Sequence, residues 1–537
     1  MFEERKLLLL DRSHMEDVTR LLSGLHAKGV RLWVDDGRLR YSAPKGSLTT
    51  GELQSLASRK AVLLEYLGRS PFAPADLPLV RREDPTALVP LTFSQQWHWN
   101  RWKRPNQRFR TACVAAKLIG RVDAYKLRES LMELVRQHES LRTKFKLTGN
   151  GVQQAVDDCF ARDFEVIDLT QISAASRESE SQTQIRRLIA FPVNPEVGPV
   201  FDAKIIRLSS MEHVLVMTRD QLIADGISNR VMFRDIFSLY SQCREGLSPC
   251  LPHTSAQFPD YALWQHKTRP SWAARHGPYW NERLEDFGRV RILRREGLLG
   301  EPRSIIVVQP VKFGRTLSAA LRDLSRREGT TLAMAVLSAY AALIFRWCGI
   351  RDLVISVVTM GRNLPELENT LGAFAYPLFL RLELSEQDDF LDLLQYVTRE
   401  YREAQSHSDS GRIGGQTPTP DIERNPTFNW ASHDVRADSK AYMNTLEPHD
   451  RTLHLEPFMV DRALKEIESE FLDGTDLDKE PSLILSDGSE GIEGSFVITG
   501  LSVPETTIKT FARNFSRFAE FLAAAPDTLV MSTSCVS

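Results

Sequence analysis

Apolar and polar positions in the first 68 residues follow patterns that predict a small separate unit. Leucines and one valine recur at helical spacing from residue 18 to 25, and a second helix is expected from residue 49 to 67. Between them, residues 30–35 and 38–42 alternate apolar and polar positions on either side of an Asp-Gly pair. This pair favours a two-residue hairpin turn, because such a turn needs positive φ at both central residues and Asp-Gly accommodates it. Residues 1–68 are therefore predicted to form a helix–hairpin–helix domain.

The predicted hairpin has one basic face. A two-residue turn places Val34 opposite Leu39 and Leu32 opposite Tyr41 on the buried side. Four residues share the outer face: Arg31, Trp33, Arg38 and Arg40. Arginines around a tryptophan suit the binding of an acidic peptide, so this face is a candidate docking surface. A basic face that is only solvated is the alternative.

A proline-rich segment, residues 69–87, is predicted to link this unit to the rest of the chain. Beyond it, strand and helix patterns alternate to the end. Asp123 is expected to cap a helix whose leucines lie on one face, and residues 334–347 are predicted to form a buried helix. Together these patterns predict an α/β (α+β) fold with two lobes, residues 88–270 and 285–537.

Composition excludes several classes of protein. The chain has 537 residues, of which 42% are apolar and 26% charged, as in globular proteins of two or three domains. Its net charge of −2 gives no reason to expect nucleic acid or a membrane surface as a partner. No apolar run reaches the ~20 residues of a membrane helix, and a signal peptide's cleavage site is missing. The six cysteines form no Cys-x-x-Cys pair, so we expect no metal site and a cytoplasmic location.

The candidate chemistry lies in the stretch MTRDQLIADGIS, residues 217–228, which follows a short apolar run. A buried strand that ends at Ala-Asp-Gly commonly delivers side chains to a site. Here it delivers Asp220, Gln221, Asp225 and Ser228, without a histidine, cysteine or lysine. The nearest histidines in sequence are His138 and His213, for which a packing role fits better than catalysis.

The N-terminal unit resembles the TubC-type β-hairpin docking domains of nonribosomal peptide synthetases. The resemblance rests on LLSGLHAKGVRLWVDDGRLRYSAPKGSLT, residues 21–49, which is most of the unit. Such domains capture the short acidic C-terminal tail of an upstream carrier-protein subunit. The resemblance therefore implies that the basic hairpin face binds such a tail.

The rest of the chain, from about residue 88, resembles the condensation domain superfamily of the same enzymes. Five stretches carry the resemblance in order: PLTFSQQWHW (90–99), RQHESLRTKF (136–145), FPDYALWQ (258–265), GRNLPELENTLGAF (361–374) and RNPTFNW (424–430). The resemblance implies two chloramphenicol-acetyltransferase-like lobes in a V shape with a tunnel at the hinge. Two carrier proteins would present phosphopantetheine-tethered substrates there, and an acceptor amine or hydroxyl would attack the donor thioester. No other cofactor is implied.

The loop departs from the usual family pattern, HHxxxDG. Both histidines are replaced, by Asp220 and Gln221, while Asp225 and Gly226 remain. The resemblance implies that Asp225 pairs with Arg142 of the LRT motif to hold the hinge. Gly226 is expected to permit either a tight turn or the close approach of a substrate arm. Ser228 is expected to cap the following helix. Asp220 is a candidate base or ammonium anchor, with a loop anchor as the alternative, and the amide of Gln221 is a candidate for positioning a reactant.

Three activities stay open. The first is a free-standing subunit, expected to be monomeric and acting on carriers in trans, that forms an amide or ester bond, because the chain ends soon after the last predicted helix. The second is heterocyclization to a thiazoline or oxazoline. Asp220, Asp225 and Ser228 match its DxxxxDxxS signature, but Ala373 stands where that branch has an aspartate. The third is a catalytically silent platform that recruits carrier proteins, which the missing histidine favours.

Overall fold

The computed structural model divides into two compact units, residues 1–78 and the chain from Leu79 onward without segments 363–365 and 405–407, and each unit is described by itself. The structure describes these residues: 31–35, 38–42, 49–60, 63, 79–102, 111–158, 163–190, 194–198, 200–252, 254, 256–285, 287–288, 292, 306–362, 364–408, 424–431, 454–457, 479–488, 490–499 and 504–530.

The N-terminal unit contains the predicted hairpin. Strands β1 (Arg31–Asp35) and β2 (Arg38–Ser42) pair antiparallel, with Val34 opposite Leu39 and Leu32 opposite Tyr41. This register confirms the predicted pairing and places positions 31, 33, 38 and 40 on one face. Helix α2 (Thr50–Ser58) follows within the predicted second helix. The predicted first helix lies outside the described residues.

The second unit holds two large sheets and a small three-stranded one, and the first large sheet defines the N-terminal lobe. Its five strands run in the order β14-β4-β9-β8-β7. Their bounds are His454–Pro457 (β14), Thr111–Ile119 (β4), Glu212–Asp220 (β9), Phe201–Arg207 (β8) and Glu165–Asp168 (β7). Strand β9 is buried along almost its whole length, including the polar residues Thr218, Arg219 and Asp220 that follow its short apolar run at 214–217.

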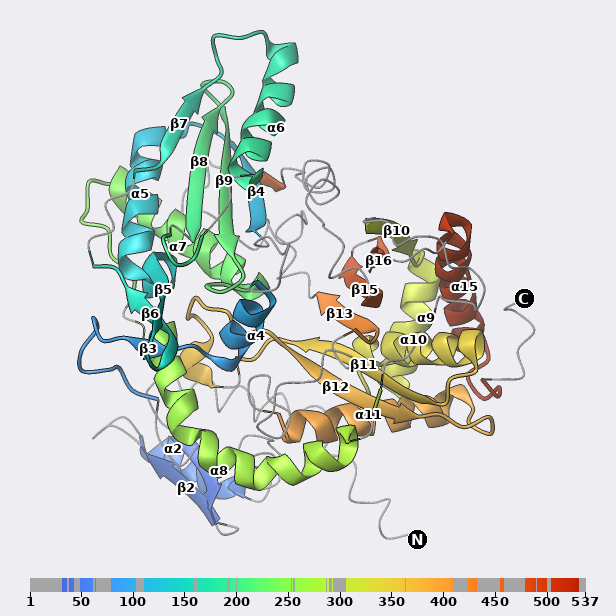
Figure 1. The fold of residues 1–537 in the computed structure, drawn as a ribbon. Coiled ribbons are helices and arrows are strands. Elements are labelled where there is room, and N and C mark those ends of the chain that lie inside the picture. The colour runs from blue at the N-terminus through green and yellow to red at the C-terminus, as the bar shows by residue number, and fades with distance from the viewer. Residues whose placement is uncertain are drawn as a thin grey trace. The chain divides into compact units, whose positions relative to one another are not determined.

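Helices cover both faces of this sheet. Helices α5 (Ala124–Gln137) and α7 (Gly226–Arg244) pack on one face, where Leu215 and Met217 of β9 point. Helix α6 (Ala174–Ala190) packs on the other face, against Val214 and Val216 (Figure 1). The carboxylate of Asp123 accepts hydrogen bonds from the first turn of α5, which confirms the predicted cap.

The C-terminal lobe is built on a six-stranded sheet with the order β10-β16-β15-β13-β11-β12. The strands are Ile306–Lys312 (β10), Gly491–Thr499 (β16), Lys479–Gly488 (β15), Thr427–Ala431 (β13), Asp352–Thr359 (β11) and Tyr376–Glu383 (β12). Helices α9 (Arg315–Arg327), α10 (Leu332–Cys348), α11 (Phe390–Ser406) and α15 (Glu505–Ala524) pack with it around one apolar core. The predicted buried helix at 334–347 is thus confirmed as α10, whose residues from Met334 to Phe345 are all buried.

Three segments join or flank the lobes. Strand β14, from the C-terminal half of the sequence, pairs antiparallel with β4 of the first sheet, so the two lobes are not divided at one point in the chain. Helix α8 (Phe258–Leu284) runs through the predicted lobe boundary. A small sheet has the strand order β3 (Val89–Pro90), β6 (Gly151–Val156) and β5 (Thr143–Thr148). Helix α4 (Phe93–Trp102) follows β3 directly in the sequence and contains most of the first motif, residues 90–99.

Within the described part of the chain, no single helix has both the length and the apolar character needed to cross a membrane. Helices α9 and α10 pass such a test only together, as a pair bent by 107°.

Candidate active site

The candidate loop joins the end of β9 to the start of α7. Strand β9 ends at Asp220, and α7 begins at Gly226 with Asp225 as its N-cap; residues 222–224 between them are buried. The Asp225 carboxylate accepts from the backbone N–H of Ser228 at 2.9 Å, and the Ser228 hydroxyl is positioned to bond both the carboxylate and backbone of Asp225. This is a reciprocal capping box, so the helix start fixes the loop's far end.

Asp225 is the centre of a buried network that includes the C-terminal half of the chain. Arg362 donates to both of its oxygens, from Nη1 at 2.6 Å and from Nη2 at 3.0 Å, and both side chains are only 6% exposed. The backbone N–H groups of Phe374 and Ala375 donate to Oδ2 at 3.1 and 3.2 Å. Burial alone would raise the pKa of Asp225, but the charge and hydrogen bonds of Arg362 hold it below its usual value.

The predicted partner of Asp225 is therefore wrong. Arg142 instead donates through Nη1 to the carbonyl of Asp157 and to the half-exposed carboxylate of Asp158, at 3.0 and 3.1 Å. Arg142 ends a short 3-10 turn, η2 (Glu139–Arg142), that leads into β5, and this position directs it toward the loop after β6. The bidentate geometry that a buried carboxylate requires is supplied by Arg362.

Two further predictions about this loop need correction. Ser228 is not the N-cap of α7 but its third residue, and its hydroxyl can donate its single proton either to Asp225 Oδ1 at 2.8 Å or to the carbonyl of Gly372 at 3.0 Å. Gly226 is the first residue of α7 and does not have a positive φ, so a left-handed turn is not the reason for a glycine there, and the close approach of a substrate arm stays a prediction. Both residues belong to the structural support of the loop.

Asp220 is a buried carboxyl group with a raised pKa. Its side-chain Oδ1 accepts from the backbone N–H of Leu222 at 2.7 Å, and none of the described residues donates to Oδ2. Burial raises the pKa of Asp220 to about 7, and the Leu222 N–H and the Arg219 charge only partly oppose this. The group can therefore exchange a proton near neutral pH, as a general base must.

Gln221 is half-buried, and its amide makes no hydrogen bond to any described residue. Its backbone is fixed by the next residue, because the N–H of Leu222 bonds Asp220 and the carbonyl of Leu222 accepts from Gln95 Nε2 at 2.9 Å. Gln95 is fully buried at the start of α4 and also bonds the side chain of Gln154. The loop is thus fixed next to Gln221, whose own side chain has no hydrogen-bond partner in the described part of the chain.

Arg219, the residue before Asp220, binds the other end of the loop. Its guanidinium donates to the side chain of Asn229 at 2.9 Å and to the carbonyls of Ala224 and Asp225. Burial lowers the pKa of Arg219 to about 10, although the nearby carboxylates of Asp225 and Asp220 raise it. Arg219 and Arg362 balance Asp220 and Asp225, so the cluster is neutral only while Asp220 is ionised.

A tightly packed loop from the C-terminal half supports the site. Gly361 has φ +64°, and a Cβ there would lie 2.0 Å from the carbonyl oxygen of Phe374. A Cβ at Gly372 would lie 2.3 Å from the ring of Phe258. The Arg362 guanidinium stacks over the Phe374 ring, 4.5 Å from its centroid. Only glycines allow this close approach. The motif GRNLPELENTLGAF thereby places the guanidinium of Arg362 and the backbone N–H of Phe374 where both donate to the Asp225 carboxylate.

The two histidines near the loop in sequence have packing roles, as expected. His138 is buried and its Nε2 lies 2.8 Å from Asp235 Oδ2. His213 is 1% exposed, and burial together with the charge of Arg207 lowers its pKa to about 4. Neither is among the residues that bond the loop.

Sequence reasoning missed Arg362, Gln95 and Arg219. The signal for Arg362 was an arginine directly after a glycine at the end of a buried strand, and for Gln95 a glutamine at the start of a helix in an apolar setting. Neither signal identifies the residue that is bound, because the Arg362–Asp225 contact spans 137 residues of sequence and the Gln95–Leu222 contact spans 127. The four hairpin residues Arg31, Trp33, Arg38 and Arg40 are placed by register alone.

Comparison with known families agrees with this architecture. A model of the condensation domain matches residues 86–433, and a model of the TubC N-terminal docking domain matches residues 18–68. The chain belongs to the condensation domain family of nonribosomal peptide synthetases and carries a TubC-type docking domain at its N-terminal side.

Curated relatives are much longer synthetases. Chondramide synthase cmdD of Chondromyces crocatus is 31% identical over 298 residues, which is 54% of this chain and 8% of that protein. Phosphinothricin tripeptide synthetase PhsC of Streptomyces viridochromogenes is 29% identical over 367 residues, 66% of this chain and 33% of that protein. The matched region is thus a small part of these relatives.

Solved structures share the fold at low identity. The X-domain from teicoplanin biosynthesis has a TM-score of 0.68 and 22% identity, and the match covers 84% of this chain and 99% of that one. An X-domain in complex with OxyB has the same TM-score and 21% identity, covering 86% and 98%. The first condensation domain of the calcium-dependent antibiotic synthetase, in complex with a substrate analogue, has a TM-score of 0.62 and 18% identity, covering 84% and 99%. The predicted two-lobed condensation fold is confirmed.

Proposed function

We propose that this protein joins two carrier-tethered substrates, by attack of an acceptor amine or hydroxyl on a donor thioester, with the loop after β9 as its active site. Membership of the condensation family supports the reaction class. The observation that carries the proposal is that the loop is held in place while two of its polar side-chain groups have no partner among the described residues. The loop is held by Arg362 through the Asp225 carboxylate and by Arg219, Gln95 and the capping box, while Asp220 Oδ2 and the Gln221 amide are left without a described partner.

The proposed roles follow from these two side chains. An acceptor ammonium must lose a proton before or during attack, and Asp220 has a pKa near neutrality that suits a base. The Gln221 amide cannot take the proton, but it can donate to the thioester carbonyl or accept from the acceptor amine. Phosphopantetheine would arrive on the carriers, which brings both reactants to one place and supplies part of the acceleration.

The test is product formation by the purified full chain. Acyl-loaded donor carrier and aminoacyl- or hydroxyacyl-loaded acceptor carrier are mixed, and intact-protein mass spectrometry follows the acceptor carrier. We expect the acceptor to gain the mass of the acyl group less the hydrogen it replaces, while the donor carrier returns to its free thiol, and both changes should depend on this protein. A product lighter by one water would assign heterocyclization instead, which Ala373 disfavours because it offers no carboxylate.

A platform without catalysis is the second candidate. The observation that favours it is Gln221, which replaces the side chain that acts as base in typical members of the family. The X-domain of teicoplanin biosynthesis, a structural neighbour, forms a complex with OxyB. Carriers that bind this protein with no product above background, in the same assay, would favour this second function.

We also propose that the hairpin captures an acidic tail of an upstream carrier-protein subunit. Positions 31, 33, 38 and 40 share one face, and three of them are arginines. Replacing Arg31, Arg38 and Arg40 together by glutamate should weaken the binding of the cognate tail peptide at least tenfold. The wild-type affinity should also fall as salt rises, because exposed charge pairs are screened. Calorimetry measures both effects, and an unchanged affinity in the triple variant would contradict the assignment.

A further inference from the structure

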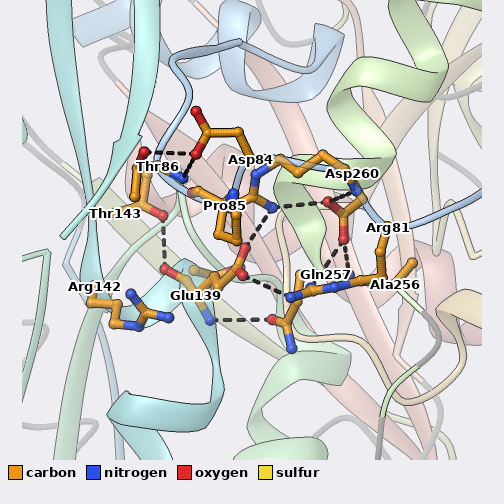
Figure 2. Close-up of polar contacts among 12 residues, drawn as sticks. Arg81, Asp84, Pro85, Thr86, Glu139, Arg142, Thr143, Ala256, Gln257 and Asp260 are labelled. Atoms are coloured by element: carbon orange, nitrogen blue, oxygen red, sulfur yellow. Dashed lines mark hydrogen bonds and ion pairs between the residues drawn. The ribbon is translucent and has the colours of Figure 1, made fainter. Parts of the chain in front are cut away.

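A second buried ionic cluster lies where the condensation unit begins. Arg82 Nη1 is 2.8 Å from Asp260 Oδ1 and 2.7 Å from Glu139 Oε2, and all three side chains are at most 4% exposed. We call Arg82, Glu139 and Asp260 the arginine clasp. Arg81 binds the same two carboxylates at 3.0 and 3.1 Å from outside and is 38% exposed (Figure 2). The predicted linker therefore ends in a segment that is packed into the unit.

The clasp is bound firmly into the unit. The backbone N–H of Arg82 also donates to Asp260 Oδ1, and its Nη2 donates to the carbonyl of Pro85 at 2.6 Å. Burial would lower the pKa of Arg82, but the hydrogen bonds and charges of Glu139 and Asp260 raise it. The arginine thus stays charged and neutralises two carboxylates that are shielded from water.

The carboxylates of the clasp hold the start of α8. Asp260 Oδ2 accepts from the backbone N–H of Gln257, the residue before the helix, at 2.8 Å. The backbone N–H of Glu139 donates to the side chain of Gln257 at 3.1 Å (Figure 2). Gln257 is therefore fixed from both sides, and with it the neighbouring Ala256 and Phe258.

The neighbours of the clasp support residues 370–375, the loop that donates to Asp225. The Thr370 hydroxyl lies 3.2 Å from the carbonyl oxygen of Ala256 and 3.1 Å from that of Glu366, so it can donate to either, and Ser140 Oγ donates to the carbonyl of Leu371 at 2.7 Å. The ring of Phe258 packs against Phe374, with centroids 4.8 Å apart. Each of these supporting residues lies within two positions of a clasp carboxylate or of Gln257.

We propose that Arg82 is a positioning residue: it acts through Glu139, Asp260 and Gln257 to hold residues 370–375 in the place where their N–H groups bind Asp225. The chain of contacts runs from the first segment of the condensation unit to the support of the active-site loop. The segment that contains Arg82 is therefore part of the support of the site. The effect of Arg82 on the rate of product formation rests on the proposed function, whereas its effect on the position of residues 370–375 does not.

The first test measures hydrogen exchange in the full-length protein. Replacing Arg82 by methionine leaves two buried carboxylates with only the outer Arg81, so Gln257 and the 370–375 loop should loosen. We expect the Phe374 and Ala375 amides to exchange about tenfold faster, because exchange requires these N–H groups to leave Asp225. Arg81→Met, the matched control, removes a partly exposed cation from the same carboxylates and should change these rates less than about twofold.

A conservative variant and the reaction complete the test. Arg82→Lys can keep one nitrogen near both carboxylates, so it should restore slow exchange, and it also serves if Arg82→Met does not fold. In the carrier assay, Arg82→Met should lower kcat about tenfold through misplacement of the loop, with carrier affinity unchanged. If the wild type forms no product, the exchange rates still decide the inference. Wild-type exchange of residues 370–375 in a folded Arg82→Met protein would overturn it.

Discussion

Replacing Arg362 by alanine should destabilise the condensation unit by about 3–5 kcal/mol, because removing one partner of a buried ion pair leaves the other charge uncompensated. The carboxylate of Asp225 would keep its four donors from Ser228, Phe374 and Ala375 but lose the only charged group that bonds it among the described residues. Chemical denaturation of the full chain, followed by tryptophan fluorescence, measures the loss.

The chain offers a matched control. Arg142→Ala removes an arginine whose carboxylate partner, Asp158, is 54% exposed, so we expect a loss of at most about 1 kcal/mol. Equal losses from the two substitutions would contradict the network around Asp225. A double variant, Arg362→Ala with Asp225→Asn, removes both charges and should recover part of the stability; a double-mutant cycle with the two single variants quantifies this.

The pH dependence of this loss has a definite sign. In the wild type the pKa of Asp225 is lowered, so the stability that it contributes is present above its unfolded pKa and is lost as pH falls. Without Arg362, burial is opposed only by neutral donors, and the pKa of Asp225 should rise. The unfolded chain is the same in this respect for both proteins, so the difference between wild type and Arg362→Ala should shrink as pH falls below the raised pKa of Asp225 in the variant, above the ordinary value of about 4, and should go on shrinking until Asp225 is protonated in the wild type too.

Local patterns were enough to predict much of the fold. Asp123 caps α5 as expected, and the hairpin has the predicted register because an Asp-Gly turn determines which residues face each other. The buried helix α10 followed from its continuous apolar run. All three depend on neighbours in sequence, which is the range over which periodicity and turn chemistry carry information.

Partners distant in sequence could not be predicted in the same way. The pattern marked Asp225 as a buried carboxylate that needs a cation, yet several arginines could satisfy that need, and Arg362 does so rather than Arg142. The strand β14 joins the sheet of the other half of the chain, which no local pattern announces. Gln95 reaches Leu222 only because α4 and the loop are brought together by the tertiary fold.

The site combines a rigid frame with one group that can change its charge. Asp225 accepts from Arg362, Ser228, Phe374 and Ala375 and stays ionised, whereas Asp220 Oδ1 has a single backbone donor and Oδ2 has none among the described residues. The two aspartates of one loop thus have opposite pKa shifts, which separates a structural carboxylate from one suited to proton transfer.

Replacing Asp220 by asparagine should slow product formation by about 10²-fold or more, as expected for the loss of a general base or ammonium anchor. The wild-type rate should rise with pH through about 7, where the carboxylate forms, and the variant should lose this rise. Gln221→Ala should cost about tenfold if its amide only orients a reactant. Rates are measured at saturating carriers, by the same mass-spectrometric assay, from about pH 6 to about 8.5, which brackets the expected pKa.

Stability separates this loss from misfolding. The folded pKa of Asp220 is raised to about 7, so the folded state binds more protons than the unfolded chain between about pH 4 and 7. The contribution of Asp220 to wild-type stability therefore falls as pH rises through that range. Asparagine keeps the oxygen that accepts from Leu222 but cannot ionise, so at about pH 8 the variant should be at least as stable as the wild type. A variant that is stable yet slow assigns Asp220 to the reaction. A rate within about twofold of wild type, with an unchanged pH profile, would make Asp220 an anchor of the loop and leave the acceleration to the confinement of the two carrier arms.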